Sequence, residues 1–360
     1  MTPTAKKLCF LTGGADQISD TLMTEGFLVA MNLAIVGATG LVGREMAKIL
    51  TQRGVKADKV FLYASSRSEG KYLSVCGKRR RVHALNEVTI KNKDISVALF
   101  SAGAAVSKTF APLFLGGGAV VIDNSSAFRM RQDVPLIVPE VNLSAIGDAK
   151  LIANPNCSTI QAVTVLKPLE DYKRIKRVIY CTYQAVSGAG QKGVIELSKS
   201  AKNDKNIIFP RRIYSNCIPQ VDDFGANGYN FEEDKMINET KKIMSRPDLA
   251  VTATCVRVPV KNCHSESVIV EFYDDYDLET VKAVLKRAKG VRVFDDYPTT
   301  VEADGMDDVL VGRIRRDHST ENGLHFWCVA DNLRKGAALN AVQIAEAVIA
   351  SRPTSGRTVT

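Results

Sequence analysis

One stretch near the start of the globular pattern decides the fold: Gly37-Ala38-Thr39-Gly40-Leu41-Val42-Gly43. The apolar run Leu33–Val36 precedes it and predicts a buried parallel strand, and Arg44–Arg53 follows with helical character. Glycines in such a turn let the backbone approach a pyrophosphate, which binds at the helix N-terminus. The spacing G-x-x-G-x-x-G is less common than G-x-G-x-x-G, and a tight turn without a ligand is the alternative.

Further apolar runs continue this pattern and then change character. The first group alternates with helical segments and predicts a Rossmann-type, doubly wound parallel sheet: Leu33–Val36, Val60–Ala64, Val97–Phe100 and Ala119–Asp123. After about residue 155 longer runs with fewer helices between them predict an α+β domain with a mixed, largely antiparallel sheet: Val178–Val186, Val251–Val258, Ser267–Tyr273 and His325–Val329. The segment Ala337–Ala350 is apolar at helical spacing.

Composition narrows the functional classes. The chain has 360 residues, enough for two domains, and the apolar and charged fractions of 45% and 24% are ordinary for a globular protein. Eight widely spaced cysteines form no C-x-x-C pair, which argues against a zinc site or a disulfide framework and for a reducing compartment. We therefore expect a cytoplasmic protein without a metal.

Charge and hydropathy exclude two further classes. The net charge is +9, but the basic run Lys78–Arg81 lacks an accompanying nucleic-acid motif, so we interpret it as a solvated face. No stretch approaches about 20 uninterrupted apolar residues, so no membrane span is predicted. Residues 1–30 make a poor secretory signal, and we expect an unstructured extension or a misassigned start before Met31.

The end of the second predicted strand bears on the cofactor. An NAD enzyme usually places Asp or Glu there to bind the ribose 2′-hydroxyl, whereas this chain has Ser65-Ser66-Arg67-Ser68. Hydroxyl groups and an arginine without a carboxylate suit a 2′-phosphate and therefore indicate NADP. The alternative is that Arg67 lies on a solvated loop.

A nucleophile is predicted at Cys157, which follows Asn154-Pro155-Asn156 and opens an apolar helix. The positive end of a helix dipole stabilises a thiolate and lowers its pKa, and a thiolate can attack an aldehyde. His264, expected on a loop between two strands, is the candidate acid/base. A buried small hydrophobe and a structural histidine are the alternatives, and Cys263 is a rival nucleophile without a helix after it.

Several signatures in order make the chain resemble the aspartate-semialdehyde dehydrogenase family from Met31 to about Ala350. They are Gly37–Gly43, Ser101–Gly103, Asp123–Arg129, Val138–Asn142, Asn154–Gln161, Tyr183–Gly190, Asn238–Lys242, His264–Ser267 and Asp331–Ala338. The resemblance implies a dinucleotide-binding domain over residues 31–155, rejoined by the helix 337–350. It also implies a catalytic and dimerisation domain over residues 156–336, in a homodimer or homotetramer.

The resemblance also implies roles for individual residues. Cys157 corresponds to the nucleophile, His264 to the acid/base and Gln184 to the residue that orients the thiohemiacetal. Substrate contacts correspond to Arg257 for the carboxylate, Arg129 and Lys235 for phosphate, and Glu232. NADP contacts correspond to Gly37, Thr39, Gly40, Leu41, Val42, Gly43, Arg67, Ser68, Ser187, Gly188 and Asn332.

The implied reaction is the NADPH-dependent conversion of aspartyl phosphate to aspartate semialdehyde and phosphate, which feeds lysine, threonine and methionine synthesis. Neither a nucleic acid nor a membrane is an expected partner. N-acetyl-glutamyl-phosphate reductase uses the same chemistry, but that family typically has Gly-Cys-Tyr where this chain has Asn156-Cys157-Ser158. A catalytically inactive nucleotide-binding relative is the other alternative, and it would be expected to lose Cys157, Gln184 or His264.

Overall fold

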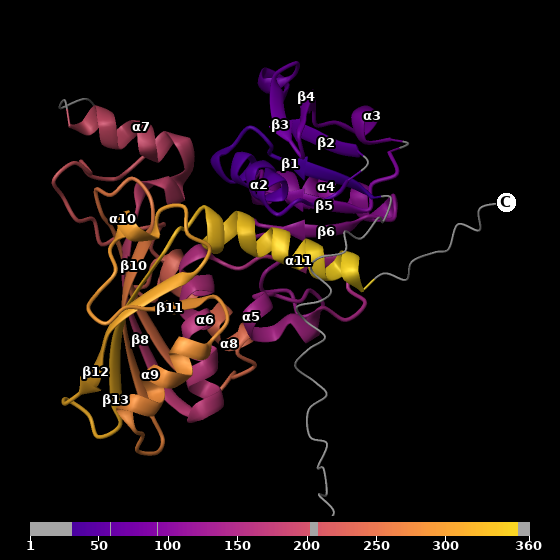
Figure 1. The fold of residues 1–360 in the computed structure, drawn as a ribbon. Helices are drawn as coiled ribbons and strands as arrows, with labels where there is room; N and C mark the ends of the chain where they lie inside the picture. Colours follow the sequence, from indigo (N-terminus) through magenta and orange to yellow (C-terminus); the bar gives the residue numbers. More distant parts are fainter. Residues whose placement is uncertain (1–30, 58, 92, 202–207, 352–360) are drawn as a thin grey trace, which may run out of the picture.

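The computed structural model describes residues 31–57, 59–91, 93–201 and 208–351. The expected N-terminal extension, residues 1–30, lies outside the described residues. Two sheets dominate the molecule, and Figure 1 shows them as separate bodies joined through helices. In the part of the chain that is described, no helix is both long and apolar enough to cross a bilayer.

The first sheet has seven strands in the order β3-β4-β2-β1-β5-β6-β7. Its strands are β1 (Asn32–Val36), β2 (Lys59–Ala64), β3 (Tyr72–Val75), β4 (Lys78–Ala84), β5 (Val97–Phe100), β6 (Val120–Asp123) and β7 (Leu151–Ala153). All neighbours pair in parallel except β3 and β4. The doubly wound parallel sheet is therefore confirmed, with one antiparallel edge strand added to it.

Helices cover both faces of this sheet. Leu33 and Ile35 of β1 pack with α2 (Leu41–Gln52) and α11 (Leu339–Ala350), whereas Ala34 and Val36 pack in the core that contains Phe114 of α4 (Ala104–Gly116). Alternate residues of a strand point to opposite faces, so an uninterrupted apolar run is what a strand buried on both faces requires. The C-terminal helix thus returns to the first sheet (Figure 1).

The second sheet has six strands in the order β11-β12-β13-β10-β8-β9. They are β8 (Ile175–Gln184), β9 (Ala250–Arg257), β10 (His264–Phe272), β11 (Val291–Val293), β12 (Val309–Asp317) and β13 (Gly323–Ala330). The pairs β8–β10, β10–β13 and β12–β13 are antiparallel, and β8–β9 and β11–β12 are parallel. The mixed, largely antiparallel sheet is confirmed.

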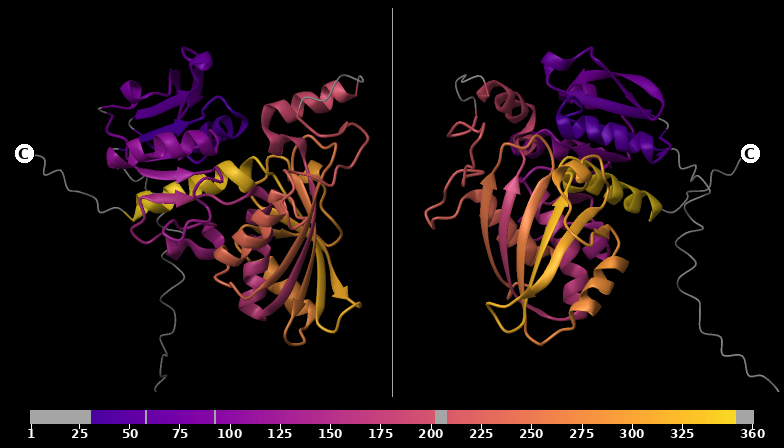
Figure 2. Two further views of the ribbon diagram at one scale, coloured as in Figure 1. Left: turned by 180° about the vertical axis from the view of Figure 1, so that it is seen from behind. Right: turned by 60° about the vertical axis from the view of Figure 1, so that its left-hand side comes forward.

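Helices cover one face of the second sheet. They are α6 (Cys157–Tyr172), α8 (Phe231–Ile243) and α9 (Leu278–Arg287). Figure 2 shows this layer behind the strands. Among the described residues, the short helix α10 (Thr300–Ala303) packs on the opposite face, where Ala303 lies in one apolar cluster with Leu310, Val329 and Trp327. Tyr183 on that face is 40% exposed and its ring lies 5.5 Å from that of Trp327.

Shorter elements connect these layers. They are η1 (Ser66–Ser68), α3 (Glu87–Ile90), α5 (Pro139–Asn142), η2 (Leu143–Ile146), η3 (Val186–Ala189), α7 (Gly190–Ser200), α10 (Thr300–Ala303) and the π-helical turn η4 (Arg334–Ala338). All eight strands predicted from the sequence are present, with bounds within three residues of those predicted. The structure adds β3, β4, β7, β11 and β12.

Two predictions at the level of elements were wrong in detail, and one predicted solvated face turned out to be a strand with mostly exposed side chains. The first helix starts at Leu41 rather than Arg44, so the last part of the glycine-rich stretch is already helical. The basic run Lys78–Arg81 forms most of strand β4, where Cys76 and Gly77, both at positive φ, make a two-residue turn back to β3. His264 is the first residue of β10 rather than a loop residue.

Candidate active site

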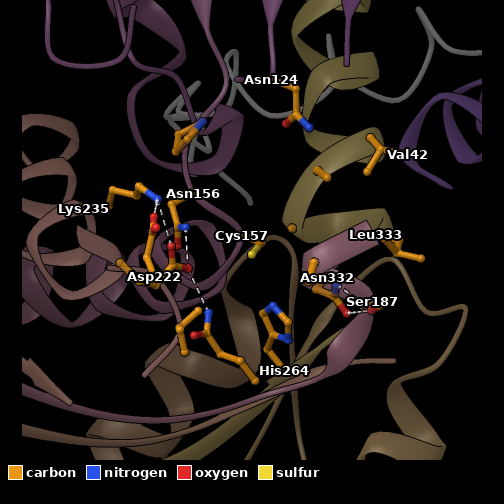
Figure 3. A pocket seen from close by; sticks show the side chains of 18 of the residues that line it. Val42, Asn124, Asn156, Cys157, Ser187, Asp222, Lys235, His264, Asn332 and Leu333 are labelled. Carbon is orange, nitrogen blue, oxygen red and sulfur yellow. Dashed lines mark hydrogen bonds and ion pairs between the residues drawn. The ribbon is translucent and has the colours of Figure 1, made fainter. Parts of the chain in front are cut away.

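A pocket of about 400 Å³ lies where the two sheets meet. Eleven of the residues predicted to act in catalysis or binding line it: Val42, Arg129, Cys157, Gln184, Ser187, Gly188, Glu232, Lys235, Arg257, His264 and Asn332. The other lining residues were not predicted: Asn124, Ser126, Pro155, Asn156, Ala189, Val221, Asp222, Leu333, Gly336 and Ala337. Figure 3 shows Cys157 and His264 facing the same space from different elements.

Cys157 occupies the first position of α6, as the sequence predicted. The Asn156 side chain caps this helix by accepting hydrogen bonds from the backbone N–H groups of Ser158 and Thr159, at 3.0 and 3.2 Å. Behind the thiol, η4 approaches so closely that a Cβ at Gly336 would lie 2.9 Å from the Cβ of Cys157. A glycine is therefore needed for η4 to pack against the cysteine.

The expected lowering of the Cys157 pKa is contradicted. Burial and the neighbouring carboxylate of Glu232 raise the pKa of this thiol to about 12, although Arg257, Arg129 and a backbone hydrogen bond at Ser158 lower it. The helix terminus is where the sequence predicted it to be, but desolvation is the larger influence on the thiol when the pocket holds no ligand.

His264 is completely buried at the start of β10. The backbone N–H of Ala185 donates to its Nδ1 at 3.0 Å, so the neutral ring carries its proton on Nε2. Nε2 is buried without a protein partner, and the residue lines the pocket. Burial and the Arg257 charge lower the pKa of His264 to about 3, so the ring is neutral at physiological pH.

Gln184, Glu232 and Asn156 form one buried hydrogen-bonded group. Gln184 Nε2 donates to Ser158 Oγ at 2.6 Å and to Glu232 Oε1 at 3.0 Å, and Asn156 Nδ2 donates to the same carboxylate oxygen at 2.7 Å. Burial by itself would raise the pKa of Glu232, but Lys235, these two amides and Arg257 lower it to about 2. Glu232 is therefore ionised, and it fixes the Gln184 amide with its nitrogen toward the carboxylate.

Three cations surround the pocket, two of them paired. Arg129 Nη1 donates to Glu239 at 3.1 Å, and Lys235 lies 2.8 Å from Asp222 and 3.3 Å from Glu232. Asp222 and Glu239 were not predicted, and with Glu232 they form the ion pairs of Arg129 and Lys235.

Arg257 has the unpaired charge. It is 4% exposed, and Nη1 donates to the Ala185 carbonyl at 2.7 Å. Its Nε has no partner, and among the described residues it makes no ion pair with a carboxylate. Burial lowers the pKa of Arg257, but the guanidinium remains charged because its ordinary pKa is above 12. A fixed, desolvated guanidinium of this kind favours an anionic ligand.

The predicted cofactor residues fall into two groups. Val42, Ser187, Gly188 and Asn332 line the pocket, whereas the others lie at the carboxyl ends of β1 and β2: Gly37, Thr39, Gly40, Leu41, Gly43, Arg67 and Ser68. A Cβ at Gly37 would lie 2.2 Å from the Ser101 carbonyl oxygen, and one at Gly43 would lie 2.2 Å from that of Gly37. These glycines are therefore required for the turn itself.

The loops after β1 and β2 meet at two hydroxyl groups. Thr39 Oγ1 donates to Ser68 Oγ at 3.2 Å, and the preceding residue, Arg67, is exposed on η1. The N-cap of α2, Gly40, has no side chain to satisfy the first backbone N–H groups of the helix. Such an uncapped helix start suits a phosphate.

The rival cysteine lies elsewhere. Cys263 is fully buried in a small apolar cluster with Ala303, Leu310 and Val329, and it does not line the pocket. Its burial and the nearby carboxylates of Asp331 and Asp304 raise its pKa. Cys263 therefore has neither access to the site nor support for a thiolate.

Comparison with known proteins places the chain in a family. Residues 32–149 match the model "Semialdehyde dehydrogenase, NAD binding domain", and residues 166–335 match "Semialdehyde dehydrogenase, dimerisation domain". The aspartate-semialdehyde dehydrogenase of Aquifex aeolicus is 51% identical over 332 residues, covering 88% of this chain and 97% of that protein.

Solved structures agree with the sequence matches. Aspartate semialdehyde dehydrogenase II from Vibrio cholerae, crystallised with ASA, has a TM-score of 0.86 at 45% identity, over 90% of this chain and 99% of that one. The Candida albicans enzyme, crystallised with NADP, has a TM-score of 0.71 at 25% identity, over 89% and 99%. With its nucleotide-binding domain and this site, the chain belongs to the aspartate-semialdehyde dehydrogenase family of oxidoreductases.

Proposed function

We propose that this protein is an NADP-dependent, phosphorylating aspartate-semialdehyde dehydrogenase that acts in the synthesis of lysine, threonine, methionine, isoleucine and diaminopimelate. In the biosynthetic direction, aspartyl phosphate and NADPH yield aspartate semialdehyde, phosphate and NADP. The observation that carries the proposal is the position of Cys157, at a capped helix start and in one pocket with His264 and Arg257.

Cys157 is the nucleophile of the proposed mechanism. Its sulfur attacks the acyl carbon of the substrate, the thiol proton leaves with the departing phosphate, and a thioester remains. The thiol must lose its proton as the site fills, because burial and Glu232 raise its pKa when no ligand is bound. If Glu232 receives the ammonium group of the substrate, its negative charge is offset, and substrate binding then favours the thiolate.

His264 and Gln184 act on the oxygen of the reacting carbonyl. As the acid/base group, the neutral imidazole presents Nε2–H to the pocket and donates a hydrogen bond from it to the substrate oxygen, which polarises the carbonyl and stabilises the oxygen of the thiohemiacetal. Gln184 uses its nitrogen on Ser158 and Glu232, so that its buried Oε1, which has no protein partner, is free to orient the intermediate.

The cationic side chains of the pocket are assigned to the two anionic ends of the substrate, its carboxylate and its phosphate. Arg257 makes no ion pair with a protein carboxylate among the described residues and is assigned to the substrate carboxylate. Lys235 and Arg129 are assigned to phosphate. Three nitrogens of Arg129 already donate to Asn154, Glu239 and Asn124, and because a guanidinium has five N–H groups, two remain for a ligand.

The residues present fit NADP. NADPH supplies the hydride when it is bound. The glycine-rich turn and the uncapped start of α2 suit the pyrophosphate of NADP. Thr39, Leu41 and Ser68 are assigned to positions beside this pyrophosphate. The exposed side chain of Arg67 is assigned to the 2′-phosphate. Ser187, Gly188 and Asn332 are assigned to the nicotinamide end, because they line the pocket that contains Cys157.

We assign residues 31–155 and the helix 337–350 to the cofactor domain and residues 156–336 to the catalytic and dimerisation domain. The face of the six-stranded sheet opposite α6, α8 and α9 is the proposed interface of a homodimer, which agrees with the dimerisation domain matched at residues 166–335. Aromatic side chains such as Tyr183 and Trp327 on that face suit burial against a second copy.

Trapping of the covalent intermediate tests the proposed function. Incubation with aspartate semialdehyde and NADP without phosphate should produce an acyl-enzyme whose labelled peptide contains Cys157. Cys157→Ala should abolish phosphate-dependent turnover, and Cys263→Ala should leave it nearly unchanged. A label on Cys263, or full activity of Cys157→Ala, would refute the mechanism.

A further inference from the structure

A second layer of polar side chains lies directly behind Gln184 and His264. Glu266 is two residues after His264 on β10, and Thr182 is two residues before Gln184 on β8, so each pair shares a face of the sheet. Glu266 stands opposite Thr182 on one side and opposite Cys328 of β13 on the other. All three are completely buried. The layer is therefore continuous across three neighbouring strands.

The first turns of α6 cover this layer. Ser158 Oγ accepts from Gln184 Nε2 at 2.6 Å, and the side chains of Ser158 and Gln161 both interact with the Glu266 carboxyl group. Gln161 Nε2 also donates to Cys328 Sγ at 3.7 Å. Ser158 and Gln161 are at most 1% exposed. Ser158 thus lies between Glu266 and the amide assigned to orient the intermediate.

The polar character of the layer is local. Beyond Glu266 the same face of β10 carries Val268, Val270 and Phe272, which are buried and apolar. Burying a polar group without a partner costs free energy, yet Glu266 Oε1, Gln161 Oε1 and Thr182 Oγ1 have no partner in the described structure. On this face of β10 the costly arrangement is confined to the layer behind the site, which indicates a role in that site rather than in the core.

The surroundings of Glu266 favour its protonated form. The ionisable groups that interact with it are Glu232 from α8, Cys328 from β13, Tyr180 from β8 and Cys255 from β9, and none of them is a cation. Burial and the Glu232 charge raise the pKa of Glu266 well above its ordinary value. A neutral carboxyl group both donates and accepts, which a carboxylate cannot do.

We propose that Glu266 is a positioning residue that holds the Ser158 hydroxyl and, through it, fixes the Gln184 amide with Oε1 turned to the substrate. Ser158 Oγ accepts from Gln184, so its own hydrogen is free to be donated to the Glu266 carboxyl group. Gln184 can then rotate only by losing both the Ser158 and the Glu232 contact. This inference rests on the proposed function, since it gives Gln184 a precise orientation to maintain.

Two substitutions at one position separate the roles of Glu266. Glu266→Gln keeps a neutral group that donates and accepts, and kcat for aspartate semialdehyde with NADP and phosphate should stay within about threefold of wild type. Glu266→Leu removes both functions at similar volume and should lower kcat about 10- to 100-fold with little change in KM, as expected for a misplaced catalytic group. Thr182→Val is the matched control, because it removes a buried polar group from the same layer that does not contact Ser158. The kcat of Thr182→Val should equal that of wild type.

A double-mutant cycle with Gln184→Ala tests the route through the amide. If Glu266 acts by positioning Gln184, then Glu266→Leu should lower kcat much less in the Gln184→Ala background than in wild type. Equal losses in both backgrounds would overturn the proposal, as would full activity of Glu266→Leu. A Glu266→Gln variant as impaired as Glu266→Leu, or one with a displaced pH–rate profile, would also overturn it, because Glu266 would then act as a charge.

Folding stability gives a readout that does not depend on activity. A carboxyl group whose folded pKa is raised is protonated when folded and ionised when unfolded, so stability falls as pH rises through this window. The unfolding constant of wild type should therefore rise relative to that of Glu266→Gln by up to tenfold per pH unit above about pH 5. If the ratio of the two unfolding constants did not change with pH, Glu266 would be ionised in the folded protein, and the proposal would be overturned. If wild type itself lacks activity, the proposed function fails, and this stability comparison still decides the state of Glu266.

Discussion

Some neighbours of Cys157 raise the pKa of its thiol and others lower it, and substitutions of single residues can test which effect is larger. Because its pKa is raised to about 12, labelling of the Cys157 peptide by iodoacetamide in the ligand-free enzyme should be slow at pH 7 and rise about tenfold per pH unit. Glu232→Gln removes the carboxylate that raises this pKa and should speed labelling at fixed pH. The measurement is the labelling rate of that peptide by mass spectrometry.

Asp234→Asn is the control for this experiment, since it removes a nearby charge on α8 that is not among the influences on the thiol. A rate already at its plateau near pH 7 would contradict the assignment of a protonated resting thiol. Equal labelling of wild type and Glu232→Gln would contradict the role of the Glu232 charge.

Cofactor choice is also a residue-scale property. Arg67 can donate charge-assisted hydrogen bonds to a 2′-phosphate, a contact worth roughly 1.5–3 kcal/mol, or about one to two orders of magnitude in affinity. Arg67→Ala should therefore raise KM for NADP far more than KM for NAD, measured by initial rates. Lys71→Ala removes a nearby exposed cation and should change neither. If both constants rise together in Arg67→Ala, Arg67 supports the loop and does not read the phosphate.

Sequence reasoning located most site residues but not their partners. Cys157 could be found because it lies at a helix start that the pattern reveals, and His264 because it lies between two predicted strands. Asp222 and Glu239 could not, since ion pairs between distant segments leave no local pattern. The pKa of Cys157 was wrongly predicted for the same reason: the helix dipole is local, whereas burial and Glu232 come from the tertiary structure.

At the scale of elements, η4 connects the two halves of the site. Arg334 forms ion pairs with Glu45 of α2 and with Asp307, and Gly336 allows the turn to contact Cys157. Gly336→Ala would place a Cβ 2.9 Å from that of Cys157, so η4 or α6 must shift. We expect kcat to fall at least tenfold and the melting temperature to decrease, measured by initial rates and calorimetry.

Gly116→Ala is the matched substitution, because a Cβ at this position in α4 has no neighbour within 4 Å. It should leave kcat unchanged and stabilise the fold by up to about 1 kcal/mol, since alanine favours a helix over glycine. Wild-type activity in Gly336→Ala would show that the close approach of η4 to Cys157 has no role in catalysis.

Some strands could not be predicted from the sequence, for physical reasons. β4 begins with four consecutive basic residues, which no apolar alternation marks, and it is held by pairing with β2 and β3. β7 and β11 are three residues long, too short for a period to appear. Long apolar strands such as β8 and β10 were found because their pattern persists over many residues.

At the scale of the whole molecule, the face of the six-stranded sheet opposite α6, α8 and α9 predicts a homodimer. Tyr183→Arg would place a charge in the proposed interface, where desolvation is costly, and should convert the dimer to monomers in analytical ultracentrifugation. Val88→Arg is the control, because Val88 is an 83% exposed apolar residue in the other domain. A dimeric Tyr183→Arg variant, or a monomeric wild type, would exclude this face as the interface.

The central claim concerns the substrate, and one assay tests it most directly. Phosphate-dependent reduction of NADP should be measured with aspartate semialdehyde and N-acetyl-glutamate semialdehyde side by side, with Cys157→Ala as the blank. Arg257 and the Asn156-Cys157-Ser158 sequence predict that kcat/KM for aspartate semialdehyde is greater by several orders of magnitude and that turnover requires phosphate. Equal rates, a preference for the acetylated substrate, or turnover independent of phosphate would contradict the account.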